Sequence, residues 1–176
     1  TVNVSYALIA DIIRSRELPD RRRAQRVIHE TLERAAEGLA LTQRPYATVG
    51  DGLQAVSATL ADALALTMRT HLLLPDGLGL RFGIGVGAIS EVEGAAGSGA
   101  DGAPGRPIQD GSAWWAAREA IEKAHHLQDE GADGLQFFFD IHAHVQGDLI
   151  VAGACRMQPF PRIADPRGQL LFHEGM

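Results

Sequence analysis

The chain has 176 residues, of which 45% are hydrophobic, with a formal net charge of −6 and one cysteine. This composition predicts a single globular domain over residues 1–176, and its acidic balance makes nucleic-acid binding an unlikely main task. No apolar run approaches the roughly 20 residues of a membrane helix, and we find no basic segment followed by an apolar one at the start. Because the lone Cys155 has no internal disulfide partner, we expect a cytoplasmic protein that is not membrane-associated.

The first predicted element is a strand at residues 4–10, which ends at Asp11. Its almost continuous apolar run is typical of a central strand that is covered on both faces. Pro19 and Asp20 then open a helix with apolar residues at i, i+3 and i+4 spacing, which ends near Gly38.

A hairpin is predicted next, because residues 46–49 and 53–57 flank the turn Gly50-Asp51-Gly52. A second helix over residues 60–72 is stopped by Pro75-Asp76-Gly77, and a strand follows at residues 80–89. The order strand, helix, strand, strand, helix, strand predicts an α+β fold of the ferredoxin-like type, an antiparallel sheet with helices on one face.

Three glycines, Gly83, Gly85 and Gly87, leave one face of the strand at residues 80–89 bare. A bare face lets a helix or a ligand approach the sheet closely, and we favour a helix. The glycines are not a dinucleotide fingerprint, because they lie within a strand and a long segment separates them from the next helix.

The rest of the chain is less regular. Residues 94–111 are rich in Gly, Ala, Pro and Asp and predict a flexible loop. A helix at residues 112–127 and a second hairpin formed by residues 135–145 and 149–154 follow. Residues 158–176 are proline-containing and are expected to be irregular.

Asp11 and Asp51 are the candidate metal ligands, because each lies at the end of a strand pattern. Two carboxylates at adjacent strand ends can hold Mg²⁺ or Mn²⁺ against a triphosphate. Taken singly, each aspartate also has a local explanation: Asp51 suits a turn and Asp11 can cap one.

Six arginines crowd residues 14–26. Arg14 and Arg16 follow Asp11 closely, where a phosphate would lie. Two interpretations remain for them: they bind phosphate, or they are simply exposed surface residues. For the arginines at residues 21–26 we favour a solvated helix start.

Four motifs carry a family resemblance: DIIRSR from Asp11, GDGLQ from Gly50, RFGIGVG from Arg81, and DGSAWWAAREAIE from Asp110. In this order they resemble the bacterial SatD family over residues 6–125, with residues from 134 onward outside the resemblance. They are also similar, more distantly, to class III nucleotidyl cyclases and their polymerase-palm-like core.

The cyclase resemblance implies metal binding by Asp11 and Asp51, with the Ile12 backbone carbonyl nearby. It also implies that Arg118 meets phosphate and that Thr48 lies where cyclases keep a base-contacting lysine. Trp114 stands where cyclases have an asparagine, so the resemblance implies the fold more than cyclisation. Trp114 and its neighbour Trp115 can be core residues, interface residues or purine-stacking residues.

Two functions follow as expectations. One is metal-dependent binding of a nucleoside triphosphate, with the reaction undefined; the alternative is a catalytically silent regulatory or protein-interaction module of the same fold. A homodimer is expected, because cyclase-like domains share their site between two subunits. Asp11→Asn is expected to abolish nucleotide binding and to leave the ligand-free protein equally or more stable, because one of two repelling carboxylates is removed.

Overall fold

The computed structural model describes residues 4–48, 50–96, 107–129, 137–145 and 148–157. The strands are β1 (Ser5–Ile12), β2 (Leu41–Ala47), β3 (Gly52–Ser57), β4 (Leu80–Gly87), β5 (Ser90–Ala96), β6 (Pro107–Asp110), β7 (Phe137–Val145) and β8 (Asp148–Met157). The helices are the 3-10 helix η1 (Ser15–Glu17) and the α-helices α1 (Arg21–Ala35), α2 (Leu60–Leu73) and α3 (Ser112–Asp129). The predicted α+β class and the ferredoxin-like order of β1 to β4 are confirmed.

A six-stranded sheet with the order β2-β3-β1-β4-β7-β8 forms the centre of the fold. The pairs β2/β3, β3/β1, β1/β4 and β7/β8 are antiparallel, whereas β4 and β7 are parallel. A parallel pair needs a crossover connection, and α3 lies within it. The predicted second hairpin is present as β7 and β8, which extend the sheet beyond β4.

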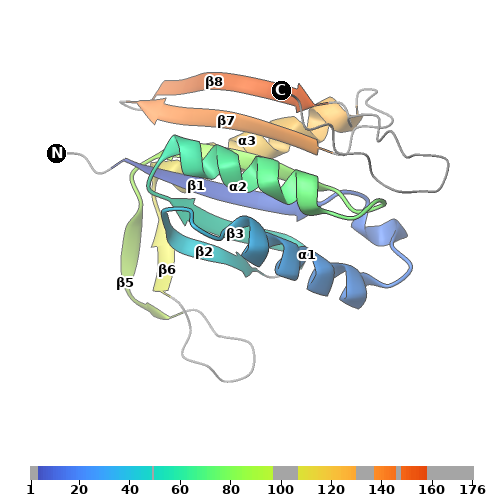
Figure 1. The fold of residues 1–176 in the computed structure, drawn as a ribbon. Helices are drawn as coiled ribbons and strands as arrows, with labels where there is room; N and C mark the ends of the chain where they lie inside the picture. Colours follow the sequence, from blue (N-terminus) through green and yellow to red (C-terminus); the bar gives the residue numbers. More distant parts are fainter. Residues whose placement is uncertain (1–3, 49, 97–106, 130–136, 146–147, 158–176) are drawn as a thin grey trace, which may run out of the picture.

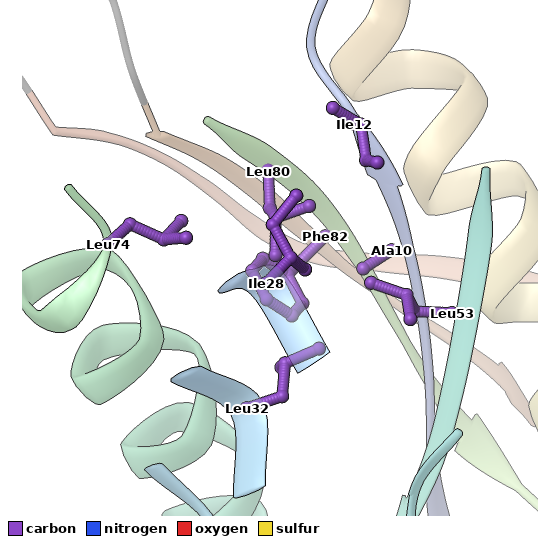
Figure 2. Packing of buried hydrophobic residues seen from close by; sticks show 8 residues of the cluster. All are labelled: Ala10, Ile12, Ile28, Leu32, Leu53, Leu74, Leu80 and Phe82. Atoms are coloured by element: carbon purple, nitrogen blue, oxygen red, sulfur yellow. The ribbon is translucent and has the colours of Figure 1, made fainter. Parts of the chain in front are cut away.

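Helices α1 and α2 cover one face of the sheet (Figure 1). Figure 2 shows the cluster beneath them, in which Ile28 and Leu32 of α1 meet Ala10 of β1 and Phe82 of β4. The further members of this cluster are Ile12, Leu53, Leu74 and Leu80. Alternate residues of each strand share a face, so this face takes the even-numbered positions of β1 and β4.

The opposite face carries α3, which corrects the prediction that all helices lie on one face. Gly83 and Gly85 point away from α1, and a Cβ atom on either glycine would collide with the backbone of α3. The glycine stripe therefore serves close helix packing, as favoured from the sequence. The alternation of β4 assigns its large side chains to α1 and α2 and its glycines to α3, which fixes α3 on the other side.

Local signals explain the helix boundaries. Asp20 is the N-cap of α1, and its Oδ1 accepts a hydrogen bond from the Arg23 N–H at 2.9 Å. Thr59 caps α2 in the same way, accepting from the Asp62 N–H at 3.0 Å. Gly38 adopts φ +72° just beyond α1, a conformation that favours glycine.

The prediction of a loop over residues 94–111 is wrong at both ends, where the structure has strands. Strands β5 and β6 form a separate two-stranded sheet, in which Ser90 pairs with Asp110 and Ala96 with Pro107. Backbone hydrogen bonds define such a ladder, so a segment without apolar alternation can still form one. Residues 97–106 and the segment 158–176, predicted to be irregular, lie outside the described residues.

Candidate functional site

One end of the sheet brings the two candidate metal ligands close in the fold. In the antiparallel β1/β3 pair, Asp11 lies opposite Gly52, the residue that follows Asp51. The hairpin between β2 and β3 is closed by a hydrogen bond from the Thr48 N–H to the Gly52 carbonyl at 2.8 Å. The register therefore places Asp11, Thr48 and Asp51 at the same end, and η1 follows β1 there (Figure 1).

Asp11 forms an ion pair with Arg81, which lies opposite it in the β1/β4 pair. The Arg81 Nε is 2.7 Å from Oδ1, and its Nη2 is 3.2 Å from Oδ2. The Arg81 side chain is only 9% exposed, whereas that of Asp11 is 33% exposed. Arg81 is two residues from Gly83, so strand alternation puts this pair on the α3 face.

Asp51 has a different set of partners, which come from η1 and α1. Nη2 of Arg21 lies 2.7 Å from Oδ1 and 2.9 Å from Oδ2, and Nε2 of Gln25 lies 3.3 Å from Oδ1. Hydrogen bonds from Ser15 and Arg21, together with the charge of Arg21, hold the pKa of the Asp51 carboxyl below its usual 3.8, although partial burial acts in the opposite direction. Asp51 is thus an anion that binds the hairpin to the start of α1.

The sequence interpretation missed these arginines. Arg21 lies at a helix start with 53% of its side chain exposed, as expected, but it also binds Asp51, which was not expected. Arg81 was noted only as part of a strand motif. Its pairing with Asp11 was accessible in principle, because an aspartate ending one strand and an arginine beginning its antiparallel neighbour lie opposite each other.

The remaining predicted residues of this end, apart from Thr48, follow Asp11 in the chain. Ile12 has a buried side chain in the α1/α2 core, so only its backbone can serve a ligand. Arg14 has the left-handed conformation, with φ 52° and ψ 39°, and Arg16 is exposed in η1. The left-handed turn at Arg14 redirects the chain from β1 into η1.

The predicted site residues on α3 do not directly follow Asp11 or the hairpin turn in the chain. Arg118 is exposed on α3, next to Ala117, which packs against Gly83 and Gly85 in the middle of β4. Trp114 is 8% exposed and packs with Ala7 and Val56, so it is a core residue. Trp115 is 57% exposed, and its indole N–H donates to Oδ1 of Asp110 at 3.0 Å.

The residues at the sheet end fit a divalent cation that brings ligands of its own. Mg²⁺ is commonly held by one or two carboxylates together with phosphate and water oxygens, and Asp11 and Asp51 supply two carboxylates. Within the part of the chain that the structure describes, no group of three or more His, Cys, Asp or Glu residues gathers to form a complete cage. Arg81 holds Asp11 on the α3 face, whereas Arg21 and Gln25 hold Asp51 toward α1 on the opposite face, so a shared cation requires both carboxylates to leave these partners.

The chain belongs to the SatD family, whose family model matches residues 5–152. This match extends past residue 134, from which the chain was expected to lie outside the resemblance, and it includes β7 and the first half of β8. This part was not recognised because its sequence carries no distinctive motif. No match was found among curated proteins.

Several solved structures of cyclases are similar at low identity. A bacterial light-regulated adenylyl cyclase is 11% identical, with 81% of this chain aligned to 43% of that one and a TM-score of 0.44. The adenylyl cyclase CyaB from P. aeruginosa is 16% identical (84% and 79% covered, TM-score 0.43), and the guanylyl cyclase Cya2 is 13% identical (92% and 96% covered, TM-score 0.40). The chain thus spans less than half of the light-regulated enzyme.

Proposed function

We propose that this SatD-family protein binds a nucleoside triphosphate through Mg²⁺ or Mn²⁺ at the end of the sheet that carries Asp11 and Asp51. The observation that supports this most is the β1/β3 register, in which Asp11 lies opposite the residue after Asp51. The arginine-containing segment that follows Asp11 supplies Arg14 and Arg16 beside this end. A bound cation would screen the carboxylates from the phosphates, which they otherwise repel.

The roles of the chain's own residues follow from their chemistry. Asp11 and Asp51 would hold the cation, with the Ile12 carbonyl as a further oxygen donor, while Arg14 and Arg16 would bind phosphate. Thr48 lies beside the hairpin turn, where its hydroxyl would face the ligand. Arg118 lies on α3, on the other face of the sheet from α1, and we propose that it binds phosphate in a site shared with a second copy.

A second candidate function is a silent regulatory or protein-interaction module. It is favoured by Trp114, which fills the core at the position where cyclases have an asparagine. A buried indole cannot present an amide to a reacting phosphate, and the loss of one such donor typically lowers a rate by about 10²–10³. We therefore propose that nucleotide is bound with little or no conversion to a cyclic product and, as the cyclase resemblance implies, by a homodimer.

Thermal-shift measurements with ATP or GTP, each with and without Mg²⁺ or Mn²⁺, test the binding proposal. A ligand that binds only the native state raises the melting temperature by mass action, so a shift is expected only when nucleotide and cation are both present. A shift of equal size without cation would contradict the role given to the carboxylates. The absence of any shift would favour the silent module.

Light scattering tests the second part of the proposal. The expected result is a mass of two chains, and a strict monomer would rule out a shared site. Robust formation of a cyclic nucleotide in the presence of Mn²⁺ would show that the buried Trp114 does not prevent cyclisation.

A further inference from the structure

The two arginines of the proposed cation site differ in accessibility. The side chain of Arg21 is 53% exposed, whereas that of Arg81 is 9% exposed. An exposed ion pair contributes little to stability and exchanges readily with solvent ions, whereas breaking a buried pair leaves an uncompensated charge. An incoming cation can therefore displace Arg21 from Asp51 far more easily than it can displace Arg81 from Asp11.

The Asp51 carboxylate also accepts more hydrogen bonds than that of Asp11. Arg21 contacts both of its carboxylate oxygens, and Gln25 and Ser15 provide further hydrogen bonds. A carboxylate offers about four lone-pair positions, so these partners leave little room for a cation. Metal binding at Asp51 requires the release of Arg21.

We infer that Arg21 is a built-in competitor for the cation at Asp51, so that the site binds metal well only when a polyphosphate gives Arg21 a new partner. This inference rests on the proposed function and adds to it a reason for obligatory coupling between metal and nucleotide. Arg21 is the first residue of α1, which begins shortly after η1; η1 contains Arg16 and is preceded by Arg14. Released from Asp51, its guanidinium lies beside the proposed phosphate site, where it can bind phosphate oxygens bidentately.

Mn²⁺ binding to the intact protein without nucleotide tests the inference, measured by titration calorimetry or by the electron paramagnetic resonance signal of free Mn²⁺. Arg21→Ala is expected to tighten Mn²⁺ binding by about two- to fivefold, the fold-change that corresponds to the energies of exposed ion pairs. Arg22→Ala is the matched control, because Arg22 is the next residue of α1, is exposed, and its loss changes the net charge equally. Arg21→Ala combined with Asp51→Asn is expected to lose the gain.

ATP provides the second readout. The ratio of Mn²⁺ affinities with and without ATP is expected to be smaller in Arg21→Ala than in the wild type, because the competitor is absent and one phosphate contact is lost. Circular dichroism melts of every variant establish that each is folded at the temperature of the titration.

The outcomes separate the inference from the proposed function. If wild-type protein binds Mn²⁺ together with ATP but Arg21→Ala behaves like Arg22→Ala, the inference is wrong and the proposed function stands. If neither wild type nor Arg21→Ala binds Mn²⁺ under any condition, the proposed function fails and the inference fails with it. Tighter Mn²⁺ binding in Arg21→Ala that is unaffected by ATP would support competition and refute transfer to phosphate.

Discussion

Arg81 and Asp11 face each other across the β1/β4 pair and are joined by two hydrogen bonds, from Nε at 2.7 Å and from Nη2 at 3.2 Å. This relationship changes the expected effect of Asp11→Asn. Removal of a repelling carboxylate would stabilise the ligand-free protein, but here the removed charge also neutralises a buried guanidinium. The second effect is larger, because desolvated charges without partners are strongly unfavourable.

Asp11→Asn is therefore expected to lower the free energy of unfolding by about 1–3 kcal/mol, the range for leaving a buried polar group poorly satisfied. Urea denaturation followed by circular dichroism measures it. Asp20→Asn is a suitable control, because asparagine also serves well as an N-cap. An unchanged or higher stability of Asp11→Asn would show that repulsion between the aspartates outweighs the ion pair.

Asp51→Asn is expected to have a smaller effect that depends on pH. The Asp51 pKa is lowered below 3.8 in the folded protein, so ionised Asp51 stabilises the fold above the unfolded pKa, and this contribution is lost as pH falls through the folded value. We expect a difference of about 0.2–1 kcal/mol between wild type and variant at pH 7, which shrinks below pH 4. Denaturation curves at both pH values check this, and a difference that grows with acidity would contradict the assignment.

Gly85→Ala is expected to destabilise the fold by about 1–3 kcal/mol or more. The added Cβ would collide with the Ala113 carbonyl and the Ala117 amide nitrogen, which are backbone atoms and cannot rotate away. Gly38→Asn is the comparison, because it also replaces a glycine, no atom lies within 4 Å of the new Cβ, and asparagine tolerates the left-handed conformation. Equal losses in the two variants, measured by urea denaturation, would mean that α3 does not depend on close contact.

Alanine substitutions of the adjacent Trp114 and Trp115 are expected to have very different effects on the free energy of unfolding. Trp114→Ala should lower the free energy of unfolding by about 3–5 kcal/mol, as for other large buried aromatic residues. Trp115→Ala removes an exposed ring and one hydrogen bond to Asp110, so a loss of about 0.5–1.5 kcal/mol is expected. Thermal or urea denaturation compares them, and similar losses would place both rings in the core or both outside it.

Much of the fold was predictable because its local signals agree with its packing. The Gly50-Asp51-Gly52 turn, the cap at Asp20 and the glycines of β4 each have one physical reason that a sequence displays. The side of the sheet taken by α3 was mispredicted, although the alternation of large side chains and glycines along β4 already assigns α3 to the face opposite α1 and α2. The strands β5 and β6 were missed because their sequences lack the apolar alternation that indicates a strand.

The candidate site was predictable only in part. The ends of the strands indicated Asp11 and Asp51, but not that each would be bound by its own arginine. Arg21 is separated from Asp51 by 30 residues and Arg81 from Asp11 by 70, so both pairs exist only through tertiary structure. Charge alone could not identify them, because Arg21 lies among several arginines with similar surroundings in the sequence.

The central position of β1 also has a consequence for synthesis on the ribosome. β1 is made before β3 and β4, yet it lies between them and pairs with both. Until β4 has left the ribosome, one edge of this apolar strand has no partner, and unpaired strand edges promote aggregation. The unpaired edge of β1 is therefore exposed while residues 13–87 are being synthesised. A chaperone that covers β1 would act before β4 has left the ribosome.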